Sequence, residues 1–137
     1  MKNLVKYCLP MVLLLVQSNI SAQQKMEIQF GEPFTLLNNV STTIGDKDHP
    51  MIIELTDFME EWGYDAPPEV ENRNYYSDVL YTIKIKAKET EKDISFYSSE
   101  INQEGDFSVD LMDYKLIILS DNYQNSSASI EMIINHL

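Results

Sequence analysis

The segment Trp62–Pro68 contains the residues best suited to contact another molecule. It holds the only tryptophan of the chain, a second aromatic residue and two adjacent prolines, and it follows directly on two glutamates. Aromatic side chains on a stiff backbone provide a large contact area at a small cost in conformational entropy. We therefore predict a binding edge made of four residues: Glu60, Glu61, Trp62 and Tyr64. The alternative is that Trp62 covers one end of the hydrophobic core with neighbouring apolar side chains.

Three potential metal ligands, Asp46, Asp48 and His49, lie close together in one loop. Carboxylate oxygens suit calcium, and a histidine suits a transition metal. The spacing matches no D-x-D-x-D-G run, and the other histidine, His136, is near the far end of the chain. The preferred interpretation is a solvent-exposed turn, and we predict no bound metal.

Three further carboxylates, Asp106, Asp110 and Asp113, precede an apolar segment that begins at Tyr114. A glycosidase-like pair of carboxylates must lie about 5 to 9 Å apart, which a sequence does not define. Aspartates at this spacing before a strand are typical of a loop, and a loop is what we predict here.

Nucleophilic catalysis and phosphate binding find no support in the pattern of residues. The chain has no G-x-S-x-G motif, one cysteine (Cys8), and four glycines that occur singly. An exposed nucleophile needs an adjacent base, and a phosphate-binding loop needs clustered glycines. We predict that the protein is not an enzyme and binds no cofactor.

The first 22 residues resemble a cleavable export signal. Lys2 and Lys6 supply the positive start, Leu9–Val16 is the apolar run, and Ser18–Ala22 has the small residues of a cleavage site. A membrane-spanning helix needs about 20 apolar residues, more than this run contains. We therefore expect cleavage after residue 22, no membrane insertion afterwards, and a periplasmic or extracellular location.

Residues 23–137 form a single predicted domain with an extreme charge. They contain all 22 acidic residues but only 8 of the 10 basic ones, which gives a formal net charge of −14. Phosphate backbones bind clustered lysines and arginines, so nucleic acid is excluded as a partner. The charge favours solubility, and it also suits the capture of a basic protein or a cation. Since no cysteine remains, the domain must fold on core packing alone.

Alternation of apolar and polar residues with a period of two dominates this domain. In Val79–Ala87, for example, apolar residues occupy one face and lysines the other, as in a half-buried antiparallel strand. Further strands are expected near Phe34–Leu36, Val40–Ile44, Ile52–Leu55, Asp93–Ser98, Tyr114–Ser120 and Ala128–Asn135. The continuous apolar runs of the last two indicate central strands. Together these patterns predict an all-β fold, an antiparallel β-sandwich of seven to eight strands.

One segment departs from this period. Leu55, Phe58, Met59 and Trp62 follow the spacing of a helical face, and Asp57 with Glu60 matches a capping box. We therefore predict one short helix near Phe58–Trp62.

The order of these segments resembles that of small bacterial exported β-sandwich domains of unknown function. The resemblance rests on the opening Gly31–Leu36 (GEPFTL), which matches their G-E-x-F-x-L strand, and on the final hairpin at Tyr114–Ile118. In one such family the middle loop carries a cysteine pair and a tryptophan, and here Trp62 lies in a comparable place. The opening is also similar to the start of chagasin-type cysteine-protease inhibitors, but Asn38–Ile44 lacks their N-P-T-T-G-Y loop. The resemblance implies an exported sandwich and transfers no functional residue.

The sequence thus favours an exported, soluble, non-catalytic binding domain that captures or inhibits a basic protein. One alternative is an accessory structural module of an envelope or surface assembly. A third hypothesis, a metal-dependent hydrolase, would use Asp46, Asp48 and His49. The sequence does not define the oligomeric state.

Overall fold

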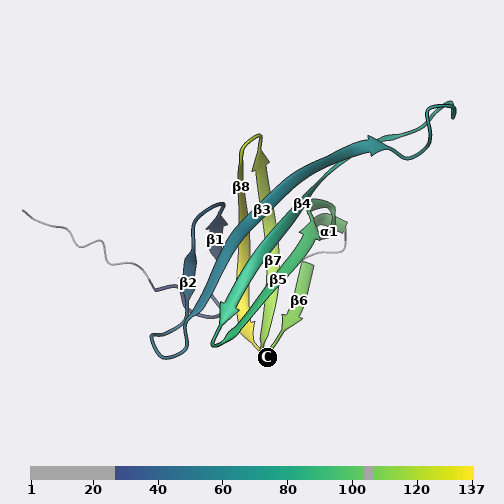
Figure 1. Cartoon of the computed structure of the whole chain (residues 1–137). Helices are drawn as coiled ribbons and strands as arrows, with labels where there is room; N and C mark the ends of the chain where they lie inside the picture. Colours follow the sequence, from purple (N-terminus) through teal and green to yellow (C-terminus); the bar gives the residue numbers. More distant parts are fainter. Residues whose placement is uncertain (1–26, 104–106) are drawn as a thin grey trace, which may run out of the picture.

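The computed structural model describes residues 27–103 and 107–137 as two four-stranded antiparallel sheets with one short helix (Figure 1). The strands are β1 (Phe34–Leu37), β2 (Thr42–Ile44), β3 (Met51–Tyr64), β4 (Tyr75–Ala87), β5 (Thr90–Tyr97), β6 (Phe107–Leu111), β7 (Tyr114–Gln124) and β8 (Ser127–His136), and the helix is α1 (Ser98–Gln103). The predicted export signal and Asp106 lie outside the described residues.

The two sheets confirm the predicted β-sandwich. One sheet has the order β1-β8-β7-β6 and the other the order β2-β3-β4-β5, and all pairs of neighbouring strands are antiparallel. Strands β7 and β8 occupy the centre of the first sheet, as their continuous apolar runs predicted. The hairpin β3–β4 occupies the centre of the second.

A single cluster of apolar side chains fills the space between the sheets. In β4, Tyr81, Ile83 and Ile85 are almost completely buried, while Lys84 and Lys86 point to the other face. No polar or charged residue is buried among those described. Each large apolar side chain buried in this way contributes about 1.5–3 kcal/mol, so the core accounts for a fold that has no disulfide to support it.

The predicted helix at Phe58–Trp62 is wrong, because this segment lies within strand β3. A β-bulge lies between Leu55 and Asp57, where Leu55 pairs with Ile83 and Asp57 pairs with Thr82. The extra residue lets Leu55 and Phe58, three positions apart, face the same side of the sheet. A bulged strand therefore produced the spacing that resembled a helical face.

The one helix of the described chain is α1, which follows β5. Its first turn is held by two acidic side chains: Glu100 accepts a hydrogen bond from the backbone N–H of Tyr97 at 2.7 Å, and Asp78 accepts one from the backbone N–H of Ser99 at 3.1 Å. The hydroxyl of Ser99 also donates to Asp78. Carboxylates at a helix N-terminus satisfy N–H groups that have no partner within the helix. Asp78 thereby fastens β4 to α1.

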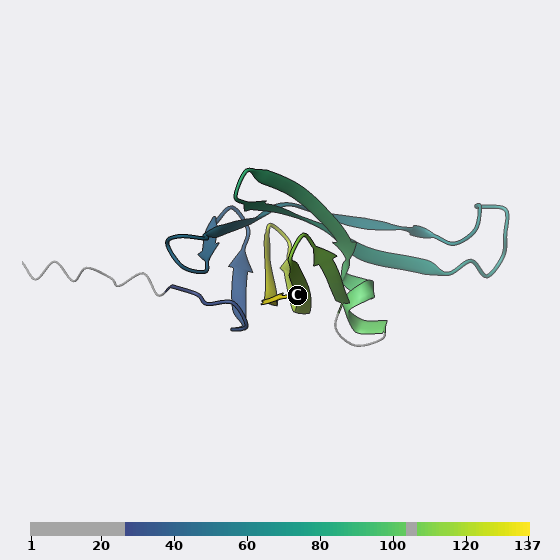
Figure 2. The ribbon, with the colours of Figure 1, turned by 90° about the horizontal axis from the view of Figure 1, so that it is seen from below.

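The hairpin β3–β4 extends beyond both of its neighbours. Strand β5 pairs with β4 only from Leu80 to Ala87, and β2 pairs with β3 only from Met51 to Ile53. Residues 57–79 therefore form a two-stranded ribbon closed by the segment 65–74, and we call these residues the arm. Figures 1 and 2 show it projecting past the rest of the sandwich.

Gly45 closes the turn after β2 in a backbone conformation that side chains rarely adopt, with a φ of +86°. A Cβ atom here would lie 2.6 Å from Cε2 of Phe30 and 3.0 Å from the carbonyl oxygen of His49. We expect Gly45→Ala to lower the free energy of unfolding by about 1–3 kcal/mol, measured by urea denaturation. Gly63→Ala is the matched control, because its new methyl group would meet only the exposed, movable ring of Tyr76. Equal stability of the two variants would contradict this expectation.

Candidate binding surface on the arm

The pairing register divides the arm into two faces. Phe58 pairs with the buried Tyr81, so the face that carries Phe58 continues the inner, core-facing side of the sheet. Because side chains alternate along a strand, the inner face carries Phe58, Glu60, Trp62, Tyr64, Tyr75, Ser77 and Val79. The outer face carries Met59, Glu61, Gly63, Tyr76 and Asp78.

Large apolar side chains are exposed on both faces of the arm. The exposed fraction is 66% for Trp62, 58% for Tyr75 and 52% for Tyr76, and Met59 and Tyr64 are about half exposed. Trp62 therefore does not cover an end of the core, which was the alternative to a binding role. Clustered exposed aromatic residues are typical of surfaces that contact another molecule.

The two predicted glutamates hold the root of the arm against the sandwich, from opposite faces. The Oε1 atom of Glu60 accepts a hydrogen bond from Ser77 Oγ at 3.1 Å, and its Oε2 accepts one from the hydroxyl of Tyr123 at 3.4 Å. On the other face, Glu61 accepts a hydrogen bond from the hydroxyl of Tyr97 at 3.1 Å, which raises the pKa of Tyr97. The structure therefore brings Glu60, but not Glu61, onto the same face as Trp62.

Strand β7 has a second bulge, between Ile118 and Ser120, that directs Asp121 and Tyr123 toward the arm. Oδ2 of Asp121 accepts a hydrogen bond of 2.7 Å from the hydroxyl of Tyr81, and the ring of Tyr123 packs edge-on against Phe58 with centroids 5.9 Å apart. Sequence reasoning missed both residues, because no residue pattern marked where β7 changes face. Asp121 and Tyr123 therefore lie at the boundary between the apolar core and the arm.

Specific contacts close the tip of the arm. Asn74 donates to both carboxylate oxygens of Asp65, from its backbone N–H at 2.7 Å and from Nδ2 at 2.8 Å. These hydrogen bonds lower the pKa of Asp65. The guanidinium carbon of Arg73 lies 4.0 Å from the centre of the Tyr64 ring, and Tyr75 packs edge-on against the same ring at 5.6 Å. The tip is therefore ordered by contacts within the arm itself.

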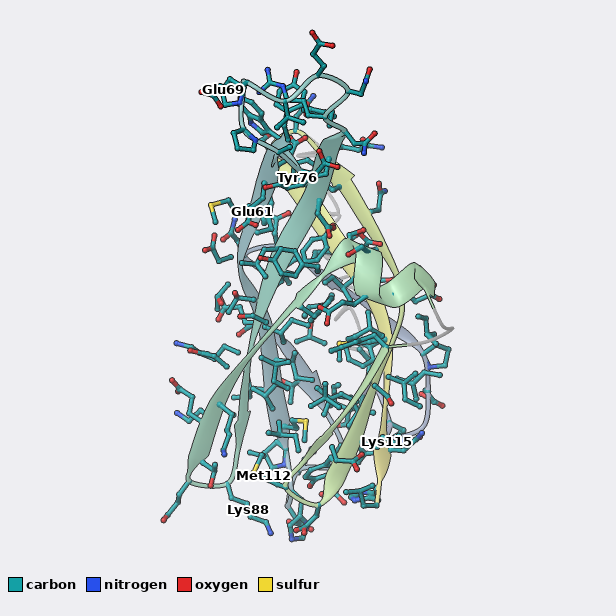
Figure 3. All side chains as sticks on the ribbon, turned by 90° about the vertical axis from the view of Figure 1, so that its right-hand side faces the viewer. Glu61, Glu69, Tyr76, Lys88, Met112 and Lys115 are labelled. Atoms are coloured by element: carbon teal, nitrogen blue, oxygen red, sulfur yellow. The ribbon has the colours of Figure 1, made fainter. Side chains whose placement is uncertain are left out.

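The arm is strongly acidic. Residues 57–79 contain seven acidic residues and one basic residue, Arg73, for a formal charge of −6. The ion pairs found in the described part of the chain, His49–Asp46 and Lys84–Glu91, both lie outside the arm. In Figure 3, Glu61, Tyr76 and Glu69 mark the arm, and Lys88 and Lys115 lie toward the opposite end. Within the described residues, no ion pair therefore neutralises a carboxylate of the arm.

The loop with the three candidate metal ligands forms a turn that its own aspartate closes. Oδ1 of Asp46 accepts hydrogen bonds from the backbone N–H groups of Asp48 at 3.0 Å and His49 at 2.8 Å, and these contacts lower the pKa of Asp46. His49 and His136, far apart in the sequence, line one open cleft together with Asp113. Within residues 27–103 and 107–137, no group of three or more histidine, cysteine or acidic side chains is placed to hold a metal ion.

The predicted loop with three aspartates is only partly correct. Asp110 lies on strand β6, where it pairs with Lys115, and Asp113 lies in the turn between β6 and β7. These two carboxylates therefore occupy a tight hairpin, and the structure does not describe the third, Asp106.

Comparisons with protein families, with curated proteins and with solved structures find no match to this chain. The resemblance to exported sandwich domains therefore stays a prediction. Within the described residues, no helix has the length and apolar character needed to cross a membrane.

Proposed function

We propose that this protein is an exported, soluble, non-catalytic binding domain that captures a basic protein through its arm. The observation that carries the proposal is Trp62, which is 66% exposed on a projecting ribbon of charge −6. The export pattern of the first 22 residues supports the location. The packed sandwich holds the arm at its base.

The chemistry of the arm suits a basic partner in two ways. Its carboxylates form no ion pair with any lysine, arginine or histidine among the described residues, so lysines and arginines of a partner meet little competition. A surface of one charge sign raises the rate of encounter with the opposite sign. Exposed aromatic rings then supply the apolar contact that holds a complex together once water is displaced.

The proposal predicts a steep dependence on salt. At low ionic strength, this protein should bind to immobilised, strongly basic folded proteins. It should not bind to immobilised acidic proteins of similar size, which serve as the control. Between about 0.01 M and about 1 M salt the Debye length falls from about 30 Å to about 3 Å, and the affinity should fall by more than about tenfold. Affinities measured by surface plasmon resonance across this range test the expectation. Equal binding to acidic and basic proteins, or binding indifferent to salt, would overturn it.

A second candidate function is an accessory module of a surface assembly. The observation in its favour is that each strand of the arm leaves one edge unpaired among the described residues, and free edges can pair with another chain. Self-repulsion at a net charge of −14 opposes assembly from copies of this chain alone. Size-exclusion chromatography over a range of concentrations separates the two: a stable monomer favours capture, and concentration-dependent oligomers favour assembly.

A further inference from the structure

One guanidinium group, that of Arg73, already lies against an aromatic ring of the arm. Arg73 is the only arginine of the chain, and its guanidinium lies over the face of Tyr64, with Tyr75 at the edge of that ring. A cation over an aromatic face is attracted by the negative charge density of the ring. The aromatic rings of the arm can therefore bind a guanidinium group. At Tyr64 that position is occupied by Arg73 of the same chain.

Trp62 is the next residue on the same face, and its ring is not stacked on by any described aromatic or cationic side chain. Its cross-strand neighbour is Ser77, which is too small to cover an indole. Among residues 27–103 and 107–137, neither a second aromatic ring nor a cation contacts Trp62. Tryptophan is the strongest of the aromatic side chains in cation–π contacts.

Glu60 provides a counter-ion at the right spacing. It precedes Trp62 by two positions on the inner face, a separation of about 7 Å along a strand. Hydrogen bonds from Ser77 and Tyr123 hold its carboxylate in place, and both donors are neutral hydroxyl groups. The negative charge of Glu60 is thus positioned but not neutralised.

We propose that the inner face of the arm binds an arginine side chain of the basic partner, with the guanidinium stacked on Trp62 and paired with Glu60. This inference rests on the proposed capture of a basic protein and specifies the chemical group that is recognised. Arginine suits the site better than lysine, because its planar guanidinium stacks on a ring while its edge donates to a carboxylate. A lysine ammonium is strongly hydrated and offers no flat face.

Two peptides of equal length and charge test the proposal, one with arginine and one with lysine alternating with serine. Because Trp62 is the only tryptophan of the chain, its fluorescence reports directly on occupancy of the site. The arginine peptide should change the emission of Trp62 and bind about fivefold more tightly than the lysine peptide. Equal affinities would overturn the arginine site and leave capture of a basic protein standing. Failure of both peptides, while a folded basic protein binds, would also overturn the arginine site. Failure of all three would remove the proposed function as well.

Point variants locate the site. Trp62→Ala should abolish the preference for arginine, so that calorimetry gives the same affinity for both peptides, whereas Trp62→Phe should keep part of it. Met59→Ala is the matched control, because Met59 is about half exposed on the opposite face and its loss should leave the preference intact. Loss of the preference in the Met59 variant, or its survival in Trp62→Ala, would contradict the proposed site.

A variant with improved binding gives an independent test. Arg73→Gln frees the Tyr64 ring for a second arginine of the peptide, so the affinity for the arginine peptide should rise by more than that for the lysine peptide. Lys92→Gln removes the same charge from the exposed turn side of β5 and should change both affinities equally. An equal response of the two peptides to Arg73→Gln would show that charge alone acts, and would overturn the arginine site.

Discussion

Replacing Trp62–Ser77 by an Asn-Gly turn is expected to eliminate binding to basic partners while leaving the sandwich folded. Glu61 and Asp78 face each other across the arm, so a two-residue turn can join them as a tight hairpin. None of the removed side chains is buried. The contacts of Glu61 with Tyr97 and of Asp78 with α1 remain. We expect the free energy of unfolding to change by no more than about 1 kcal/mol.

The loss of binding must be distinguished from an effect of the changed net charge. The replaced segment contains three acidic residues and Arg73, so the shortened protein loses two negative charges. The double variant Glu89→Gln with Asp93→Asn loses the same charge from the exposed end of β5, with the arm intact. This control should bind basic proteins nearly as tightly as the parent in surface plasmon resonance. If the shortened protein also binds, the binding surface lies on the body of the sandwich and the proposed role of the arm is wrong.

Tyr81→Ala is expected to cause the largest loss of stability, about 3–5 kcal/mol. Tyr81 is completely buried, its ring lies 5.7 Å from that of Phe96, and its hydroxyl reaches across to Asp121 on the other sheet. Truncation leaves a cavity the size of a phenol ring at the root of the arm. The free energy of unfolding of a native protein is only about 5–15 kcal/mol, so this variant should lose a large part of it. Urea denaturation followed by far-ultraviolet circular dichroism measures the loss, since the exposed Trp62 is a poor probe of the core.

The milder variant Tyr81→Phe tests the hydroxyl through its dependence on pH. Burial, and then the hydrogen bond to Asp121, raise the pKa of Tyr81 well above its ordinary value of 10.0. Above that pH the unfolded chain loses this proton and the folded chain keeps it, so stability is present below pH 10.0 and falls as the pH rises further. Above pH 10.0, the free energy of unfolding of the parent should fall with pH more steeply than that of Tyr81→Phe, by up to about 1.4 kcal/mol per pH unit. Parallel alkaline profiles of the two proteins would contradict this account.

The sequence predicts most of the sandwich because alternation with a period of two is a direct consequence of burying one face of a strand. Strand β4 follows this alternation, and its burial agrees with the pattern. Strands β7 and β8 were located instead by their continuous apolar runs, in which buried and partly buried side chains alternate. The prediction failed where a bulge interrupts the alternation. At Thr56 the spacing of inward residues changes from two to three, and no local feature distinguishes this from the first turn of a helix.

The true helix was missed for a related reason. Segment Ser98–Gln103 is only six residues long, too short to show a helical period. One of its N-terminal acceptors, Asp78, comes from a strand distant in the sequence. Short helices of this kind depend on tertiary contacts more than on intrinsic propensity.

The residues of the proposed binding surface were predictable by type but not by arrangement. Composition alone singled out Trp62, Tyr64 and the two glutamates, since a lone tryptophan among acids and prolines is a distinctive pattern. That Glu60 shares a face with Trp62, and that Glu61 does not, follows from the strand register, which the helical interpretation obscured. The role of Tyr123 required the fold of β7, which brings it to Glu60 across a separation of 63 residues.

The measurement that tests the central claim most directly is a map of the binding surface by NMR. The isotope-labelled protein is titrated with the arginine peptide while the backbone amide resonances and the indole N–H of Trp62 are followed. We predict that the largest shifts fall within residues 57–79, led by Trp62 and its neighbours on the inner face. Shifts confined to the sandwich, for example around the cleft that contains His49 and His136, would contradict the assignment of the arm as the binding surface.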